Sequence, residues 1–390
     1  MKKILFLFKL RDSLILYNIF SKYEKKNVEE FVSKNGYSYF DGNSFIKNIN
    51  AEWSLFYKNN LIDIKLYHDN DLSENYSEYD DVIVFDTKYL FEKSDIDNFK
   101  FKTIFLAIDE IPQPINHIKM LIDSGIKFIS SGNTKITNNL SYGYFYSYKL
   151  AILFYYYRLG FYHLNLDNID VVKQNILGFY HKSNYKKNRD SYITQITNLF
   201  KNKNNNYIKN YSIPYNDYTT LLDLKYDHGW TKNHITSYTD YIKSICILIF
   251  ETDVAVNEYH TTEKTLKAIL FSKLNIPSIL VCNYKQLIEL VNDGYWFLNC
   301  EFIDFNLLMN SNEVKGRRIL NKSVEDSVNF LLEIFELNSK DLNKTNEYIR
   351  DKFSYKMQNN YKIFNETIYD IKIQDEIMDF ILEPSHSKII

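Results

Sequence analysis

The stretch that decides the fold covers residues 245–304 and reads ICILIFETDVAVNEYHTTEKTLKAILFSKLNIPSILVCNYKQLIELVNDGYWFLNCEFID. An apolar run at 245–250 is followed by a polar loop, and residues 262–264 (Thr-Glu-Lys) open a segment with the apolar spacing of a helix. Pro277 ends that helix, and residues 279–282 form a second apolar run typical of a buried strand. The pattern therefore predicts a strand–loop–helix–strand unit.

The start of the predicted helix suits an anionic ligand. A helix N-terminus presents backbone N–H groups without intrahelical partners and carries the positive end of the helix dipole. Lys264 adds a positive charge for a phosphate, and the Glu263 carboxylate can accept hydrogen bonds from ribose hydroxyls. In the alternative interpretation, Glu263 and Lys264 are an ordinary charged pair on a solvated first turn. The flanking strands favour the ligand site.

The length of 390 residues exceeds what a single hydrophobic core usually supports, which favours two domains. The formal net charge of −2 provides no overall field to attract nucleic acid or an anionic membrane. The chain contains 34 tyrosines, so an individual tyrosine carries little functional information. The three cysteines, Cys246, Cys282 and Cys300, are widely spaced and typical of buried thiols in a reducing compartment, and no CxxC pair indicates zinc.

The N-terminus, MKKILFLFKLRD (residues 1–12), superficially resembles a signal peptide. Its apolar run is short, Lys9 interrupts it, and no small-residue cleavage site follows, so we expect a first core strand instead. Nowhere does the sequence contain about 18 consecutive apolar residues, the length that a membrane-spanning helix requires. We therefore expect a cytoplasmic protein without a membrane span.

Predicted strands alternate with predicted helices along the chain, which is typical of parallel, doubly wound sheets. We expect two Rossmann-like domains, at residues 1–168 and 169–340, joined by a polar linker at 165–170, and C-terminal helices at 341–390 that can cross back to the first domain. An Asn- and Lys-rich segment at 201–210 is expected to be a solvated turn. The predicted strands are residues 3–8, short strands within 37–67, 82–85, a strand ending at Asp109, 127–130 and 176–180; the predicted helices are 14–31, 115–124, 143–163, 190–201 and 324–335.

Ligands of doubly wound sheets bind outside the carboxyl ends of the strands, so the candidate site residues are those that follow predicted strands. Asp109 and Glu110 follow a strand of the first domain. In the second domain, Glu251 follows the strand at 245–250, and the basic loop HKSNYKKNR (181–189) follows the domain's first strand. These strand ends would place cations around a diphosphate and a carboxylate opposite it, in a cleft between the domains.

Three of these segments resemble a known family. The sequences FET (250–252), EYHTTEK (258–264) and IPSIL (276–280) are similar to the FENS, DYxTEK and PVV-like elements of the α1,3-fucosyltransferases and of related viral and phage glycosyltransferases. The chain departs from the family pattern in two places. FET lacks the asparagine of FENS, and the spacing to TEK is one residue longer, which puts His260 where the family has tyrosine.

Other elements extend the resemblance. The family has an arginine that opens a helix after a strand and a polar loop, similar to residues 176–189 here. Its ESP element in the first domain is similar to Glu-Ile-Pro at 110–112, and the GYWF and ID segments at 294–297 and 303–304 look like elements of the phage relatives. The resemblance is best over residues 176–304. It implies the transferase class without a particular sugar or base.

The resemblance implies a GT-B fold, α/β with two Rossmann-like domains and an interdomain cleft. It also implies inverting transfer of a sugar from a nucleotide-diphosphate sugar to an acceptor hydroxyl, without a cofactor. Glu110 would be the general base, with Asp109 as its substitute. Arg189 and Lys264 would stabilise the leaving diphosphate, and Glu263 would bind the ribose. The other donor-binding candidates are Thr262, Glu251, His260, Lys182 and Asn184.

We expect no obligatory metal ion. Residues 69–71 read Asp-Asn-Asp and match the D-x-D metal signature of another glycosyltransferase fold. The motif lies in a polar, acidic loop and follows no clear strand, which favours a solvated turn.

Two other functions stay open. The basic, aromatic-containing stretches at 181–189 and 201–210 could hold a nucleic-acid backbone, which would suit a phage or viral enzyme that glycosylates a hydroxymethylated DNA base. The chain could also be a catalytically idle GT-B-like module that binds a glycan or a partner. Several candidates have purely structural interpretations as well: Arg189 as ordinary basic surface, Glu110 as a loop carboxylate before a proline, Glu251 as a buried strand-end residue, and His260 as a loop histidine.

Overall fold

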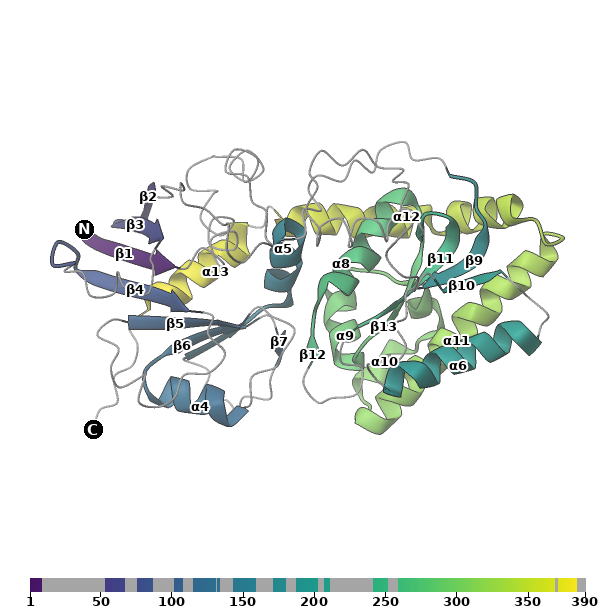
Figure 1. Ribbon diagram of the computed structural model, residues 1–390, viewed down its shortest axis with the longest axis horizontal. Helices are drawn as coiled ribbons and strands as arrows, with labels where there is room; N and C mark the ends of the chain where they lie inside the picture. The colour runs from purple at the N-terminus through teal and green to yellow at the C-terminus, as the bar shows by residue number, and fades with distance from the viewer. Residues whose placement is uncertain are drawn as a thin grey trace, which may run out of the picture. The chain divides into compact units, whose positions relative to one another are not determined.

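The chain divides into two compact units in the computed structural model, Met1–Arg158 with Tyr369–Ile390, and Leu159–Ile368 (Figure 1). Both units contain a mostly parallel β-sheet and helices, so the predicted α/β class is confirmed. The predicted linker at 165–170 lies outside the described residues. The structure describes residues 1–8, 53–66, 76–86, 102–107, 115–130, 132–133, 143–158, 171–179, 187–202, 207–210, 241–251, 259–368 and 371–383.

The described part of the first unit is built on a seven-stranded sheet in the order β2-β3-β1-β4-β5-β6-β8. All neighbours pair in parallel except β2 and β3, which form an antiparallel hairpin. A further short strand, β7 (Gly132–Asn133), follows β6. The strands of the sheet are β1 (Lys2–Phe8), β2 (Trp53–Tyr57), β3 (Asn60–Leu66), β4 (Asp81–Asp86), β5 (Lys102–Ala107), β6 (Lys127–Ser130) and β8 (Tyr144–Tyr146).

The predicted strands of this unit are confirmed at 3–8, 82–85 and 127–130 by β1, β4 and β6. Ile4 to Leu7 of β1 are all buried, as expected for a central parallel strand with both faces covered. The short strands predicted within 37–67 are confirmed by β2 and β3, which form a hairpin. Its turn residues Lys58 and Asn59 have φ values of 42° and 65°, the backbone of a two-residue type I′ turn.

The helices of the first unit are α4 (Ile115–Asp123), α5 (Tyr148–Arg158) and α13 (Ile371–Leu382). The prediction for 115–124 is confirmed by α4, whereas the single helix predicted over 143–163 is wrong at its start. There Tyr144–Tyr146 form β8, and the Tyr144 ring stacks on the Phe128 ring with 5.7 Å between the centroids. Aromatic side chains suit such a pleated surface, and this cross-strand contact outweighs the helical pattern.

The second unit contains a four-stranded parallel sheet within its described residues, in the order β10-β9-β11-β13. Its strands are β9 (Asn175–Phe179), β10 (Ile208–Asn210), β11 (Ser244–Phe250) and β13 (Ser278–Val281), and a two-residue strand, β12 (Tyr259–His260), precedes the helix that joins β11 to β13. The predicted strands at 176–180, 245–250 and 279–282 are confirmed. The solvated turn predicted at 201–210 is wrong for Ile208–Asn210, which pair with β9.

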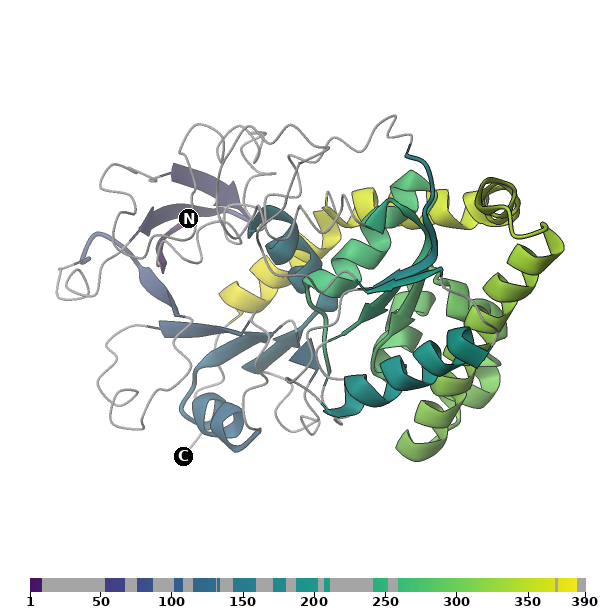
Figure 2. The ribbon, with the colours of Figure 1, turned by 45° about the vertical axis from the view of Figure 1, so that its right-hand side comes forward.

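Helices cover both faces of this sheet. Figures 1 and 2 show α6 (Lys187–Asn202) and α11 (Glu313–Leu337) on one side and α8 (Glu263–Leu270) and α12 (Leu342–Ile368) on the other. This is the arrangement that right-handed crossovers produce when strands are added on both sides of the first strand. The remaining helices are η5 (Phe271–Leu274), α9 (Tyr284–Asn292), η6 (Leu298–Phe302) and α10 (Phe305–Met309).

Two buried asparagines fasten the segment after α9 to the rest of the unit. The Asn299 side chain accepts a hydrogen bond from Leu280 N at 3.1 Å and donates to Leu280 O at 3.2 Å, so it completes the open edge of β13. The Asn360 side chain of α12 likewise accepts a hydrogen bond from Trp296 N and donates one to Trp296 O, both at 2.6 Å. Backbone groups that would otherwise be buried without partners are thereby satisfied.

Gly316 of α11 marks a close approach between two helices of the second unit. A Cβ atom there would lie 2.8 Å from Cγ of Tyr284, the first residue of α9, and 2.9 and 3.0 Å from two further ring atoms. Gly316→Ala gains about 1 kcal/mol of helix propensity but overpacks the contact at a cost of roughly 1–3 kcal/mol. We expect urea unfolding to show a net loss of about 1 kcal/mol. In a Tyr284→Ala background the same substitution should be neutral or stabilising; stabilisation in the wild-type background would contradict the prediction.

Candidate functional site

The strand order of the second unit identifies one edge of the sheet as the place for a ligand. The chain adds β10 on one side of β9 and then β11 and β13 on the other, so the topological switch lies between β9 and β11. Open α/β sheets bind ligands outside the carboxyl ends of the strands at such a switch. Glu251 directly follows β11 there. α9 begins at this edge because it follows β13, and the start of α8 lies here because Thr262 and Thr265 donate hydrogen bonds to Glu251.

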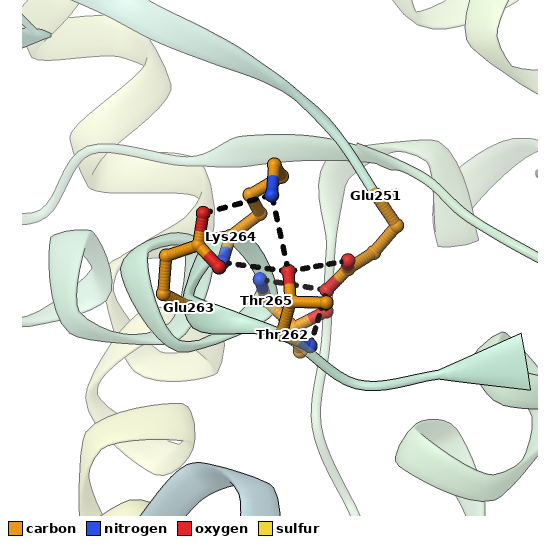
Figure 3. Close-up of polar contacts among 5 residues, drawn as sticks. All are labelled: Glu251, Thr262, Glu263, Lys264 and Thr265. Carbon is orange, nitrogen blue, oxygen red and sulfur yellow. Dashed lines mark hydrogen bonds and ion pairs between the residues drawn. The ribbon is translucent and has the colours of Figure 1, made fainter. Parts of the chain in front are cut away.

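Glu251 is fully buried and binds the start of α8 (Figure 3). Its Oε1 atom accepts hydrogen bonds from Thr265 N at 3.0 Å, from Thr262 N at 3.0 Å and from the Thr265 hydroxyl. Its Oε2 atom accepts from the Thr262 hydroxyl at 2.7 Å. The four donors compensate the carboxylate for its lost hydration, and the positive end of the α8 dipole stabilises its charge.

Glu251 therefore joins the end of β11 to the start of α8. Thr262 is the N-cap of α8, and its hydroxyl also accepts from Lys264 N at 3.3 Å. Backbone N–H groups that the sequence leaves open for an anion, those of Thr262, Lys264 and Thr265, thus donate within the protein. An anion at this helix start would be bound mainly by side chains. In this arrangement the Glu251 carboxylate positions the helix start.

Lys264 and Glu263 form an ion pair beside this network. The Lys264 ammonium lies 2.8 Å from Glu263 Oε1 and 3.4 Å from the Thr262 hydroxyl. The side chain of Lys264 is 24% exposed, whereas that of Glu263 is 6% exposed. Figure 3 shows Glu263 and Lys264 meeting on one side of the helix start and Glu251 reaching the two threonines from the other. Lys264 is thus the most exposed of the three charged side chains in this cluster.

The N-terminus of α9 lies beside that of α8, and this helix is not predicted from the sequence. Asn283 is the N-cap of α9 and accepts from Lys285 N at 2.9 Å. Gln286, three residues after it, is buried and donates from Nε2 to the hydroxyls of Thr261 at 3.1 Å and Thr265 at 3.4 Å. The spacing Asn-x-x-Gln after an apolar run is a capping-box pattern that could have predicted this helix. Gln286 links the first turns of α8 and α9 and makes the edge one connected polar network.

Comparison with protein-family models and with curated proteins finds no match to this chain. The residues at this edge and the strand order of the second unit therefore provide the evidence for function.

The structure places the remaining candidates only in part. Arg189 lies in the first turn of α6, which follows β9 on the other side of the topological switch, and His260 lies in β12; their side chains are outside the described structure. β5 ends at Ala107, two residues before Asp109. Residues 108–114, 180–186 and 67–75 are outside the described ranges, and with them Asp109, Glu110, Lys182, Asn184 and the Asp-Asn-Asp motif at 69–71.

The three cysteines offer no nucleophile at this edge. Burial raises the pKa of Cys282, which follows β13, well above its usual value, and the negative charge of Glu251 raises it further. Burial also raises the pKa of Cys300 to about 12 and that of Cys246 still more strongly. These thiols stay protonated at neutral pH, and a protonated thiol neither attacks nor binds a metal.

The residues that the structure describes contain no group of three or more His, Cys, Asp or Glu side chains close enough to hold a metal ion. Within the same residues, no helix has both the length and the apolar character that crossing a membrane requires.

Proposed function

We propose that the chain is an inverting glycosyltransferase of the GT-B class that uses a nucleotide-diphosphate sugar. The observation that carries the proposal is the partly exposed Lys264 side chain at the start of α8, at the carboxyl edge of the sheet beside the β9/β11 switch. A cation on a preorganised helix start at this edge is suited to a phosphate group. The Glu251 network supports the proposal because it holds the backbone of Lys264 in place.

The diphosphate would replace Glu263 as the partner of Lys264. In the free protein the Glu263 carboxylate neutralises the ammonium at 2.8 Å. A diphosphate carries more charge than one carboxylate, so it competes effectively for the same cation. Glu263, once displaced, can accept hydrogen bonds from the ribose hydroxyls of the same nucleotide. One residue pair would then bind both the diphosphate and the ribose.

The chemical step would use residues from both sequence halves. Glu110 takes the proton of the acceptor hydroxyl while the acceptor oxygen bonds to the anomeric carbon and the bond from that carbon to the diphosphate breaks, with inversion. The electron pair of the broken bond leaves on the nucleoside diphosphate, where Lys264 and Arg189 neutralise the added charge. The acceptor is a glycan or another hydroxyl compound.

A thermal-shift panel of UDP-, GDP-, dTDP- and CMP-sugars tests the proposal. A specific ligand at 100 times its Kd stabilises the folded state by about 2.7 kcal/mol, so one diphosphate sugar should raise the Tm clearly. CMP-sugars carry a single phosphate and serve as the matched control, which should shift the Tm less. A panel without any shift, together with no donor hydrolysis, would leave the idle binding module as the better explanation.

Glu263→Gln separates the two roles of Glu263. The substitution removes the charge that competes for Lys264, so inorganic pyrophosphate should bind about threefold more tightly. The nucleoside diphosphate selected by the panel should bind more weakly than to the wild type, because an amide is a poorer acceptor for the ribose hydroxyls than a carboxylate. Isothermal titration calorimetry measures both affinities. A change of the same sign and size for the two ligands would contradict the exchange of partners.

A further inference from the structure

The strand β2 lies at one end of the sheet of the first unit, and the described residues contain no strand on its outer side. On its inner side β2 pairs with β3, with Tyr57 opposite Asn60 across the two-residue turn. The residues that flank such a turn exchange both backbone hydrogen bonds, and pairs with and without hydrogen bonds then alternate along the hairpin. Residues 53, 55 and 57 therefore bond to β3, whereas the backbone N–H and C=O groups of Ser54 and Phe56 point outwards.

The outer edge of β2 is open. Ser54 and Phe56 form no backbone hydrogen bond from their outward groups to any residue that the structure describes. The side chain of Phe56 is 67% exposed, so an aromatic ring lies in solvent beside these groups. A row of unpaired backbone groups on an edge strand is a template on which another strand can pair.

The devices that usually protect an edge strand are absent from β2. Proteins block such edges with charged residues, with proline or with a bulge. The strand reads WSLFY (53–57), which contains neither a charged residue nor a proline, and it pairs with β3 at all five positions without a bulge. Its aromatic residues and its leucine also favour pairing between strands. An unprotected edge of this kind indicates a contact with another strand.

A second copy of β2 fits this edge. Two copies related by a two-fold axis at residue 55 run antiparallel, with Ser54 of each opposite Phe56 of the other. All the outward groups of both residues are then used, in four hydrogen bonds. No other antiparallel register of two β2 strands pairs both residues within the strand. The two Phe56 side chains lie on the same face as diagonal neighbours, close enough for their rings to meet, and no like charges oppose each other.

We propose that two copies of this chain associate through β2, by antiparallel pairing that joins the sheets of their first units into one. A five-residue strand buries far less surface than the roughly 1,200–2,000 Å² of a stable interface, so we expect a weak dimer that forms at high protein concentration. The pairing uses the first unit alone and is independent of the sugar transfer proposed for the chain.

Sedimentation velocity measures the association of the full chain between about 10 µM and about 1 mM, where we expect mostly monomer and then a monomer–dimer equilibrium. Amide hydrogen exchange at Ser54 and Phe56 should slow as the dimer fraction rises, because the dimer supplies acceptors for their N–H groups. Exchange at residues 55 and 57 should depend less on concentration, since their N–H groups already bond to β3. A chain that stays monomeric at about 1 mM, or a dimer without slowed exchange at Ser54 and Phe56, would overturn the proposal.

Ser54→Pro removes one outward N–H group from each copy, and an edge strand tolerates proline where the N–H faces solvent. The substitution also removes the Ser54 hydroxyl, which donates to Asp63, so Ser54→Ala is the matched control. Two of the four hydrogen bonds are lost in Ser54→Pro, which should weaken the association at least about tenfold, whereas Ser54→Ala should change it less than about twofold. Equal association of the two variants would contradict pairing through this edge.

Phe56→Lys tests the contact between the rings and leaves the backbone groups in place. Because Phe56 is largely exposed, the fold should be kept, and two ammonium groups would face each other across the two-fold axis. We expect the association to weaken at least about tenfold. Tyr355→Lys makes a similar change at an 81% exposed aromatic side chain of α12 and should leave the association unchanged. Wild-type association in Phe56→Lys, or the same loss in Tyr355→Lys, would overturn the proposal.

Discussion

Replacing Lys264 with alanine should weaken the binding of the nucleotide-diphosphate sugar at least about tenfold, since a hydrogen bond to a charged group contributes about 1.5–3 kcal/mol. Lys264 is the partly exposed cationic side chain in the first turn of α8. The N–H groups of Thr262, Lys264 and Thr265 already donate to Glu251 and Thr262, so they cannot replace it. The loss should appear in equilibrium binding and, through the leaving group, in kcat as well.

Lys267→Ala is the matched control for this prediction. Lys267 lies on the same helix, about one turn further from the N-terminus. Its replacement by alanine removes the same charge from α8. Donor affinity should change less than about twofold in this variant, because it loses only a distant charge. Lys264→Arg should retain more affinity than Lys264→Ala, since the charge is kept. If Lys264→Ala bound the donor as the wild type does, the main support for a transferase would be gone.

The sequence predicts the elements around this site well, because their apolar patterns are long and regular. The apolar run at 245–250 predicts a buried strand, and the spacing of Leu266, Ile269 and Leu270 predicts a helix with one apolar face. The structure contains both. Short elements are less predictable. β8 and β10 contain three residues each, and their extended form depends on pairing with β6 and β9, which lie far from them in the sequence.

The hydrogen-bond partners of the Glu251 carboxylate could not be predicted for a related reason. Its partners, Thr262 and Thr265, follow it by 11 and 14 residues, and only the return of the chain over the end of β11 brings them together. The sequence pattern showed a carboxylate at a strand end and hydroxyls at a helix start. It did not show that the helix start is satisfied by that carboxylate, which shifts the expected anion contact from the backbone to Lys264.

Replacing Glu251 with alanine should lower the free energy of unfolding of the second unit by about 4 kcal/mol. The substitution leaves the buried N–H groups of Thr262 and Thr265 without their acceptor, and each buried donor without a partner costs about 1–3 kcal/mol. The two hydroxyls lose their acceptor as well, and a cavity adds to the loss. For a unit of this size the Tm should fall by roughly 10 °C.

Glu251→Gln and Glu333→Ala complete the test. Glutamine fills the same space and keeps one acceptor oxygen, but its NH₂ group faces donors, so we expect a loss of about 2 kcal/mol, between wild type and alanine. Glu333 is exposed on α11, and its replacement should change stability by less than about 0.5 kcal/mol. Hydrogen exchange should quicken first in β11 and in the first turn of α8, because Glu251 joins these two segments. If Glu251→Gln lost donor affinity at a temperature where the unit stays folded, the position of the α8 start would matter for binding as well as for stability. A stability loss in Glu251→Ala no larger than that in Glu333→Ala would contradict the role assigned to Glu251.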